Sequence, residues 1–316
     1  MNPIDAEINA KISSATNILI VSHVRPDGDA IGATLGLGLA LIHSGKTVQM
    51  VLNDGLPASF RHLPGSELIK KEPRGEPDLF ITVDCADFKR TGKQFQSYRK
   101  PDINIDHHVT NESYGVTNLI EPASVATSAV LTDHLPIWGL TIDHDVAANL
   151  ATGIVTDTLG FRTSNTTPAS LRQMALLMET GINMPDLYTR ALVSRSFSAA
   201  RYWGAGLSGL KTLDGIVYAT MRVADRKHAG YGGNDDADLI NIISAIEDHV
   251  VGMVFVEQPT TVKISWRALQ PGINVAQIAT FFGGGGHKAA AGADIAGSLD
   301  DIQARVLQTT REMLNL

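Results

Sequence analysis

Histidines and aspartates, the side chains that most often bind divalent metal ions together, stand at four separate places in the chain. They are His23, Asp27 and Asp29 in the first group, Asp84 in the second, Asp106, His107 and His108 in the third, and Asp157 in the fourth. Carboxylates that are brought together repel one another and raise one another's pKa unless a cation neutralises them. Two divalent ions would balance four of these five carboxylates, so this set of residues predicts a metal site.

The ligand types also indicate which metal and which reaction to expect. Oxygen and imidazole ligands without a thiolate favour Mn²⁺, or Mg²⁺, over a structural zinc ion. The single cysteine, Cys85, follows Asp84 and is expected to be a small buried residue rather than a ligand. Two divalent ions about 3.5–4 Å apart can activate water and stabilise the attacking and leaving oxygens of a displacement at phosphorus. Hydrolysis of phosphate esters is therefore the reaction that these residues favour.

The spacing of the first motif, HVRPDGDA, excludes two other uses of paired aspartates. An aspartate-nucleophile phosphatase has the pattern DxDxT, but Ile31 occupies the position of the threonine. An EF-hand calcium loop needs an oxygen-bearing side chain at that same position and a glutamate at its twelfth, where this chain has Gly38. We therefore interpret Asp27 and Asp29 as part of the shared metal site.

Three apolar runs, at residues 17–24, 78–85 and 103–108, lead into the first three groups. Their β-branched content and lack of alternation predict strands that are covered on both faces, as in a parallel sheet. A helix at 30–43 and a further strand at 47–52 fit between them. The sequence thus predicts a doubly wound, mainly parallel α/β domain. All strands of such a sheet share one carboxyl edge, where the aspartates and histidines would meet.

The rest of the chain predicts more helices in the first domain and a smaller α/β domain after it. Helices are expected at 124–135, 143–155 and 167–181, the last with Thr167 as its cap, Pro168 at its first position and Gly181 beyond its end. In the second domain we expect strands at 215–222 and within 250–268, and helices at 236–246, 274–282 and 299–314. We therefore divide the chain into a metal-binding domain at 1–185, a linker at 186–196 and a substrate-binding domain at 197–316.

Gly32, Gly36 and Gly38 recur along the helix expected at 30–43. Such spacing also occurs where membrane helices dimerise, but the weakly polar stretch 30–42 is shorter than the roughly 20 apolar residues that span a bilayer. We expect these glycines to let the helix pack closely against the sheet.

Composition and charge bound the remaining possibilities for the 316-residue chain. With 44% hydrophobic and 19% charged residues it has the material for buried cores, which excludes a disordered chain. Its 26 Lys and Arg against 33 Asp and Glu give a net charge of -7, the opposite of what a protein that grips long duplexes needs. One cysteine cannot form an internal disulfide, and acidic residues stand where a signal peptide would be basic and apolar. We expect a cytoplasmic protein with no membrane role.

Five segments of the sequence together resemble a known family. HVRPDGDAIGA (23–33), VDCAD (83–87), IDHHVTN (105–111) and GIVTDT (153–158) are similar to the four ordered motifs of the DHH phosphoesterases, a family named after its Asp-His-His triplet. The segment ISWRALQPGINVAQIATFFGGGGHKAAAG (264–292) resembles the end of the DHH-associated C-terminal domain. Within the family, the length and the two-domain form are most similar to the branch of bifunctional oligoribonucleases and 3′-phosphoadenosine 5′-phosphate phosphatases.

The resemblance implies a role for each candidate residue of the metal site. The ligands would be His23 and Asp27 for one ion, Asp29, His107 and Asp157 for the other, and Asp84 as a bridge between both. Asp106 would orient its neighbours from outside the ligand set, and His108 would face the substrate phosphate and donate a proton to the leaving oxygen. His108 and Asp84 are thus the implied catalytic residues. The chain departs from the family at TDTLGF, where Leu159 and Gly160 stand in place of a glycine directly after the second threonine.

A glycine run near the C-terminus predicts a turn that binds substrate. Residues 283–286 cannot easily continue a helix, since each glycine costs about 1 kcal/mol in a helix interior. A turn would let successive N–H groups converge on a phosphate, whereas a flexible linker is the alternative. Arg267 adds a guanidinium that can bind a phosphate through two hydrogen bonds or stack on a base. The expected substrate-binding residues are Arg267, Gly284, Gly285, Gly286, His287 and Lys288.

The expected substrates follow from a metal site in the first domain and a glycine segment in the second. With the active site in a cleft between the two domains, only a short nucleotide would touch both walls. The leading hypothesis is a Mn²⁺-dependent hydrolase that cuts short oligoribonucleotides to mononucleotides and converts 3′-phosphoadenosine 5′-phosphate to AMP. The alternatives are a phosphodiesterase for cyclic or linear signalling dinucleotides, such as cyclic di-AMP, and a catalytically silent nucleotide-binding regulator. A homodimer is compatible with the sequence.

Overall fold

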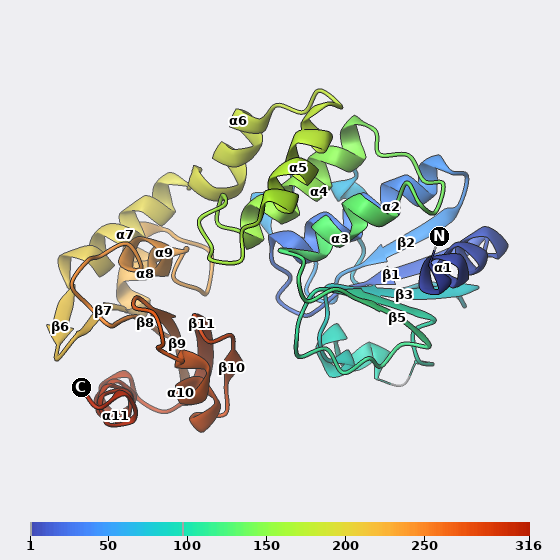
Figure 1. The fold of residues 1–316 in the computed structure, drawn as a ribbon. Helices are drawn as coiled ribbons and strands as arrows, with labels where there is room; N and C mark the ends of the chain where they lie inside the picture. The colour runs from blue at the N-terminus through green and yellow to red at the C-terminus, as the bar shows by residue number, and fades with distance from the viewer. Residues whose placement is uncertain (1, 97) are drawn as a thin grey trace. The chain divides into compact units, whose positions relative to one another are not determined.

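The computed structural model describes residues 2–96 and 98–316, and the chain divides into two compact units, Met1–Ser194 and Arg195–Leu316 (Figure 1). Helical turns occupy most of the segment 186–196 that we interpreted as a linker. α6 (Met184–Tyr188) leads directly into a π-helical turn, η5 (Thr189–Val193), and α7 (Phe197–Ser208) begins the second unit.

Five parallel strands form the sheet of the first unit, in the order β2-β1-β3-β4-β5. Their bounds are β1 (Asn17–Val21), β2 (Thr47–Val51), β3 (Leu79–Val83), β4 (Ile103–Asp106) and β5 (Thr117–Ile120). Every residue of β3 and β4 is buried, as continuous apolar runs in a parallel sheet require. This confirms the predicted parallel α/β sheet. The chain reverses its direction across the sheet between β1 and β3, the place where such folds bind ligands.

The two faces of this sheet are covered differently. The larger core lies under four helices, and α2, α3 and α4 share one side of the strands in Figure 1. They are α1 (Pro3–Ser14), α2 (Gly28–His43), α3 (Thr127–His134) and α4 (His144–Asp157). On the other face a small aromatic core around Phe80 and Phe95 is covered by short 3₁₀ turns, η3 (Phe88–Thr91) and η4 (Lys93–Phe95). Short helical turns therefore cover this face, as α-helices cover the other.

The glycines of α2 mostly contact a neighbouring helix rather than the sheet. A Cβ atom at Gly32 would meet the backbone of α4 at Asn149, and one at Gly36 would meet the side chain of Leu150. Only at Gly38 would it meet the sheet, at Met50 of β2. The expectation that all three glycines pack against the sheet was therefore wrong for two of them. They allow α2 and α4, which carry metal-site residues, to approach closely.

The remaining elements of the first unit are short, apart from α5 (Pro168–Met178). α5 begins as predicted: the Thr167 side chain accepts the N–H of Ser170, and Pro168 occupies the first turn. Two further 3₁₀ turns, η1 (Ala58–Phe60) and η2 (Ser66–Leu68), follow β2.

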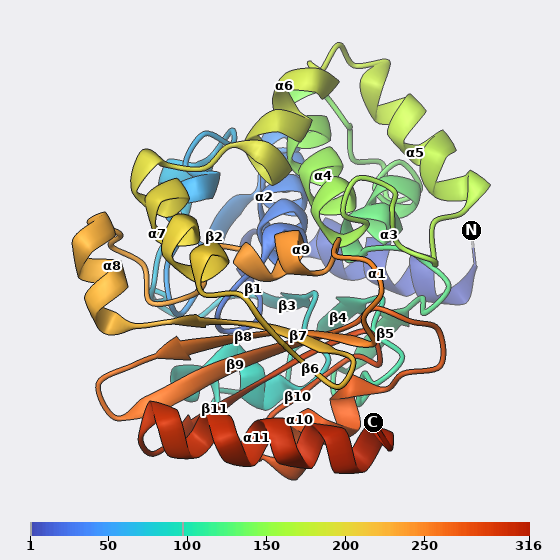
Figure 2. The ribbon, with the colours of Figure 1, turned by 90° about the vertical axis from the view of Figure 1, so that its left-hand side faces the viewer.

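The second unit is a mixed sheet with helices on both faces. The strand order is β10-β11-β9-β8-β7-β6, antiparallel except for the pair β7 and β8. The strands are β6 (Lys211–Leu213), β7 (Ile216–Met221), β8 (Val251–Glu257), β9 (Thr261–Ala268), β10 (Gly285–Gly286) and β11 (Ala290–Ala296). The helices are α8 (Val223–Ala229), α9 (Leu239–Ile243), α10 (Val275–Phe281) and α11 (Leu299–Leu314), in addition to α7. Figure 2 shows α11 along one face of the strands and α7 and α9 on the other, each face with its own core.

The glycine run at 283–286 ends α10 and opens a hairpin. The N–H groups of Gly283 and Gly284 donate to carbonyls of the last turn of α10 at 2.9 and 2.8 Å. The β10 strand then pairs with β11, and the N–H of His287 donates to the carbonyl of Ala290 at 2.8 Å. Because these three donors are used within the chain, they do not form the phosphate-binding nest that the sequence predicted.

No helix within residues 2–96 and 98–316 combines the length and the apolar composition that a membrane crossing needs.

Candidate metal centre

The loops after β1, β3 and β4 and the end of α4 meet at the carboxyl edge of the parallel sheet. Ligand atoms of the predicted residues lie within 4.8 Å of one another in three overlapping groups. The groups are His23, Asp27 and Asp84, then Asp29, His107 and Asp157, and finally Asp84, Asp106, His107 and His108. The structure therefore brings together all eight residues that the sequence singled out for the metal site.

Asp84 lies between the groups, and its two carboxylate oxygens face different histidines. Oδ2 is 3.6 Å from His23 Nε2, whereas Oδ1 is 3.8 Å from His107 Nε2. The residue is 1% exposed and has a φ of 52°, a left-handed conformation in which aspartate and asparagine are enriched among non-glycine residues. The turn at the end of β3 thus directs one buried carboxylate toward both sides of the site.

His23 and His107 are oriented in the same way. Each Nδ1 lies near a backbone carbonyl, that of Val24 at 2.9 Å and that of Ser124 at 3.3 Å. Each Nε2 faces carboxylate oxygens at 3.5–4.0 Å, longer than a hydrogen bond. The carbonyls favour the tautomer with its proton on Nδ1, which leaves Nε2 available as a metal ligand.

Helix N-termini orient Asp27 and Asp29. The Asp27 side chain caps α2, where Oδ1 accepts the N–H groups of Asp29 and Ala30 at 3.1 Å each. Asp29 serves a different helix: its carboxylate accepts the N–H groups of Thr127 at 2.6 Å and Ser128 at 2.9 Å, at the start of α3. The residue at the N-cap position of α3 is an alanine, whose side chain cannot accept a hydrogen bond. Asp29, from a distant part of the chain, therefore accepts the first N–H groups of α3 instead.

Thr127 also contacts Asp84 directly. Its Oγ1 donates to Asp84 Oδ1 at 3.0 Å, while its backbone N–H holds Asp29. One residue of α3 thus fixes two of the carboxylates that face the candidate metal positions. Sequence reasoning missed it, although a threonine close to the start of a predicted helix is a common signal for a capping interaction.

Replacing Thr127 by valine is expected to weaken metal binding by about 10- to 100-fold, the usual cost of losing an outer hydrogen bond to a ligand. The valine keeps the shape and the backbone N–H but removes the donor to Asp84. Calorimetric titration with Mn²⁺ measures the effect, and Thr127→Ser, which keeps the hydroxyl, should bind nearly as tightly as the wild type. Equal losses in the valine and serine variants would count against a role for this hydrogen bond.

A hydrogen-bond chain orients His108. Its Nδ1 is 2.7 Å from Asp106 Oδ1, and the Asn111 side chain donates to Asp106 Oδ2 at 2.6 Å. Burial disfavours the charged imidazole, but the hydrogen bond to Asp106 and the nearby charge of Asp84 outweigh it and raise the pKa of His108 to about 9. Asp106 is fully buried, and it also accepts the N–H groups of His107 and His108. Asp106 is therefore placed to orient His108.

Asp157 is the last residue of α4, where the helix dipole disfavours a negative charge. Its side chain is 33% exposed, and Oδ2 lies 3.5 Å from His107 Nε2. Burial, followed by the charges of Asp84 and Asp27, raises the pKa of Asp157 to about 8. A carboxylate in a position that is unfavourable for stability is typical of a functional site.

The loop after Asp157 has an uncommon backbone. Leu159, Gly160 and Phe161 have φ values of 48°, 71° and 65°, so three successive residues are left-handed. The Thr158 side chain supports the turn by accepting the N–H of Phe161 at 3.0 Å. Leu159, where the sequence departs from the family pattern, thus has a conformation that glycine adopts without strain.

In the presence of a chelator at pH 8, the Asp157→Asn variant is expected to be more stable than the wild type. In the presence of Mn²⁺, the variant is expected to be less stable than the wild type. A carboxyl whose folded-state pKa is raised loses stability as the pH climbs from its unfolded pKa toward 8, and asparagine avoids this loss. We expect the melting temperature in chelator to rise by about 2–4 °C, the shift that 1 kcal/mol produces in a unit of this size. This difference in melting temperature between the variant and the wild type should become smaller as the pH falls toward 4. With Mn²⁺ the wild type is stabilised more than the variant, because it binds the metal more tightly. A variant that is less stable than the wild type in chelator at pH 8 would contradict this prediction.

The donor set fits divalent cations. Without a cation, burial and the charges of Asp84 and Asp157 hold the pKa of Asp29 well above its usual range. Burial also disfavours a charged His23, but its contacts with Asp27 and Asp84 outweigh this and raise its pKa to about 10. Protons would thus take up the positions that a cation fills, and metal binding would release them.

Cys85 does not contribute a thiolate to this donor set. The residue is fully buried, its thiol donates to the carbonyl of Asp87 at 3.1 Å, and burial raises its pKa to about 12. It is therefore the small buried residue that the sequence predicted. Carboxylate and imidazole donors alone suit Mn²⁺ or Mg²⁺ better than a structural zinc ion.

The predicted substrate-binding residues gather at one end of the second unit's sheet. Arg267 of β9 pairs with Ala290 of β11, next to the hairpin that carries His287 and Lys288. The Arg267 guanidinium donates to the carbonyl of Trp266 at 3.1 Å, and burial lowers its pKa. A half-buried arginine beside a glycine hairpin is compatible with phosphate binding.

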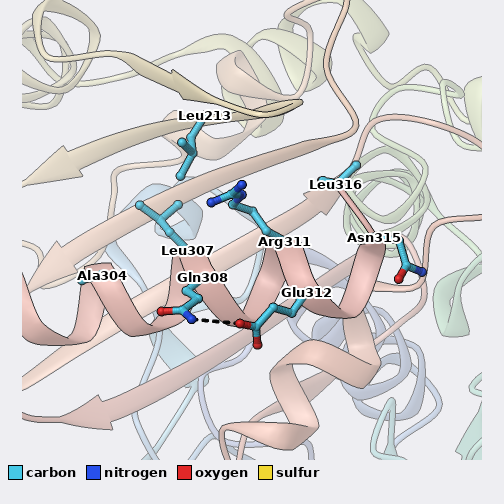
Figure 3. A pocket seen from close by; sticks show the side chains of 8 residues that line it. All are labelled: Leu213, Ala304, Leu307, Gln308, Arg311, Glu312, Asn315 and Leu316. Carbon is cyan, nitrogen blue, oxygen red and sulfur yellow. Dashed lines mark hydrogen bonds between the residues drawn. The ribbon is translucent and has the colours of Figure 1, made fainter.

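A hollow of about 490 Å³ lies elsewhere on the second unit (Figure 3). It is formed by α11 and the end of β6, with Leu213, Leu307 and Leu316 among its lining residues. Its arginine, Arg311, is paired with Asp214 at 2.6 Å, and none of the predicted site residues lines it. We therefore do not assign the catalytic function to this hollow.

The comparisons with known proteins agree with the geometry. Residues 17–154 match the family described as "DHH family, N-terminal domain", and residues 214–312 match the "DHHA1 domain". A protein of Thermus thermophilus named "Bifunctional oligoribonuclease and PAP phosphatase NrnA" is 35% identical over 94% of this chain and 90% of its own length. A protein of Mycoplasma genitalium with the same name is 30% identical over 91% of this chain and 91% of its own length. The solved structure of an exopolyphosphatase-related protein from Bacteroides fragilis is 25% identical, with a TM-score of 0.90 over 99% of this chain and 98% of that one.

Proposed function

This chain belongs to the DHH family, and from that membership and its metal centre we propose that it hydrolyses short oligoribonucleotides to mononucleotides and 3′-phosphoadenosine 5′-phosphate to AMP. The substrates come from the names of the two relatives, which carry both activities. The observation that supports the reaction best is the placement of Asp84, because its two oxygens face the two groups of candidate ligands.

The metal ligands of this proposal are those that the family resemblance implied. His23 and Asp27 would hold one ion, Asp29, His107 and Asp157 would hold the other, and Asp84 would contribute to both. Two divalent cations, with Mn²⁺ the expected metal, would supply the charge that activates a water molecule and stabilises the phosphoryl oxygens. The proposal accounts for the cluster of buried carboxylates, in which burial and the neighbouring charge of Asp84 raise the pKa values of Asp29 and Asp157.

The chain's own residues then position the substrate and move the proton. Asp106 holds Nδ1 of His108, so Nε2 of the same ring is the atom that we assign to the leaving oxygen. The raised pKa of His108 favours the protonated ring that a proton donor needs at neutral pH. Thr127 and the N-terminus of α3 keep Asp84 and Asp29 in place throughout.

Substrate binding in this proposal also involves the second unit. Arg267, His287 and Lys288 supply positive or hydrogen-bonding groups beside the hairpin of residues 284–286. These side chains would bind the nucleotide outside the bond that is broken. They would supply the local attraction that a chain with a net charge of -7 does not provide as a whole.

A substrate panel tests the proposed function. Purified protein is assayed with Mn²⁺ and with Mg²⁺ on 3′-phosphoadenosine 5′-phosphate, RNAs of graded length, and linear and cyclic di-AMP. We expect rapid turnover of dinucleotides, short RNAs and 3′-phosphoadenosine 5′-phosphate, and little turnover of long RNA. Turnover confined to cyclic or linear di-AMP would favour a signalling phosphodiesterase, and binding without turnover of any substrate would favour a regulator.

A further inference from the structure

Arg90 lies beside the metal centre without belonging to it. It is part of η3, the turn that follows β3 and Asp84, and its side chain is exposed. Its backbone carbonyl accepts the N–H of Val24 at 2.6 Å, which ties η3 to the loop that carries His23. Its guanidinium Nη2 is 3.5 Å from Nδ1 of His23. The positive group therefore stands at the Nδ1 edge of a candidate ligand, whose Nε2 faces the carboxylates.

The contact with His23 does not use the donors of Arg90. Nδ1 of His23 lies 2.9 Å from the carbonyl of Val24 and carries the proton in the tautomer that leaves Nε2 for a metal. A protonated Nδ1 cannot accept a hydrogen bond from a guanidinium. Within residues 2–96 and 98–316 no carboxylate pairs with the Arg90 side chain. Its N–H fork is thus available to an anion from outside the chain.

The backbone around Arg90 is fixed, which distinguishes it from an ordinary surface arginine. The Asp87 side chain accepts the N–H of Lys89 at 2.8 Å, and the Asp87 carbonyl accepts the N–H of Arg90 at 2.9 Å. Together with the bond to Val24, these contacts hold η3 against the loop after β1. A guanidinium on a fixed backbone loses less freedom when it binds a phosphate.

We propose that Arg90 binds a second phosphate group of the substrate, one that is not hydrolysed, on the His23 side of the metal centre. This inference rests on the proposed function, because it assumes that the scissile phosphate occupies the metal centre. A guanidinium binds a phosphate through two parallel, charge-assisted hydrogen bonds, and it supplies positive charge next to a strongly acidic site. Nucleotides that carry a terminal phosphate in addition to the scissile one fit this arrangement. Both proposed substrate classes include such molecules.

The test compares one dinucleotide with and without a 5′-terminal phosphate, pApA and ApA, in the presence of Mn²⁺. The measured quantity is the ratio of kcat/KM for pApA to that for ApA. We expect a ratio of about 10 to 100 for the wild type, since a hydrogen-bonded charge pair contributes this much. Arg90→Ala should reduce the ratio to within about threefold of unity, mainly through pApA, and Arg90→Lys should give an intermediate ratio because it keeps the charge without the fork.

Lys89→Ala is the matched control. Lys89 is also exposed and basic and stands next to Arg90, so general electrostatic attraction would be weakened equally by either substitution. We expect the control to keep the wild-type ratio. A ratio that falls equally in both variants would overturn a specific phosphate site. Equal losses on both substrates in Arg90→Ala would also overturn it, since they would indicate damage to the loop rather than loss of a phosphate contact.

A binding measurement separates this inference from the proposed function. Calorimetry compares 3′-phosphoadenosine 5′-phosphate, the bisphosphate, with AMP, for the wild type and for Arg90→Ala, with His108→Gln added to both proteins so that the bisphosphate is not turned over to AMP. We expect the wild type to prefer the bisphosphate by about tenfold or more and the variant to lose that preference. Wild-type protein that hydrolyses neither dinucleotide would refute the proposed function, and the binding preference would still decide the role of Arg90. No preference for the bisphosphate in the wild type would refute the second phosphate site.

Discussion

Replacing Asp84 by asparagine is expected to lower kcat/KM for every phosphoester substrate by about a thousandfold or more. The two oxygens of this buried carboxylate face His23 and His107, so Asp84 reaches both groups of ligands. A neutral amide cannot hold two cations together, and the metals contribute several kcal/mol to such reactions. Asparagine keeps the side-chain shape and tolerates the left-handed backbone at this position, so the fold should persist.

Steady-state kinetics at saturating Mn²⁺ measure the loss, and circular dichroism verifies that the variant is folded. Asp145→Asn is the matched control, because Asp145 is exposed on the first turn of α4 and its carboxylate pairs with the exposed His144. We expect the control to stay within about twofold of the wild type, as surface substitutions usually do. An Asp84→Asn variant with a near-normal rate would mean that Asp84 does not organise the site.

Replacing His108 by glutamine should lower the rate on RNA dinucleotides by about 10²- to 10⁴-fold, the range that a positioned proton donor contributes. His108 is oriented by Asp106 at 2.7 Å, and this hydrogen bond and the charge of Asp84 raise its pKa, which favours the charged ring. Glutamine keeps a hydrogen-bonding group of similar reach but cannot deliver a proton.

The leaving group distinguishes proton donation from a structural role. A nitrophenyl phosphodiester needs no proton on its leaving oxygen, so the loss in the glutamine variant should shrink to about tenfold or less on this substrate. His144→Gln, at an exposed histidine of α4, serves as the control and should behave like the wild type on both substrates. A loss of equal size on the nitrophenyl substrate would show that His108 acts through the structure of the site.

The parallel sheet and the metal centre were predictable for related physical reasons. Strands covered on both faces must be apolar throughout, which made the runs ending near Val21, Val83 and Asp106 visible in the sequence. Parallel strands share a carboxyl edge, so polar residues after each run had to converge there. Seven of the eight residues of the metal centre came together for this reason, whereas the eighth, Asp157, is brought there by the end of α4.

The features that sequence did not reveal depend on contacts between distant elements. Asp29 lies at the start of one helix but caps another, so no local pattern links it to Thr127. The glycine run predicts a turn, but no local pattern shows which carbonyls accept hydrogen bonds from its N–H groups. The phosphate-binding nest was therefore predicted incorrectly for the donors that bond within the chain. The helix α1 and the edge strand β5 were missed too, since α1 is only weakly amphipathic and half of β5 is partly exposed.

The position of bound metal is the most direct test of the whole account. Crystals grown with Mn²⁺ and measured at the manganese absorption edge locate each ion by its anomalous signal. We expect two peaks at the carboxyl edge of the parallel sheet, one among His23, Asp27 and Asp84 and the other among Asp29, Asp84, His107 and Asp157. Peaks elsewhere, or none at this edge, would contradict it.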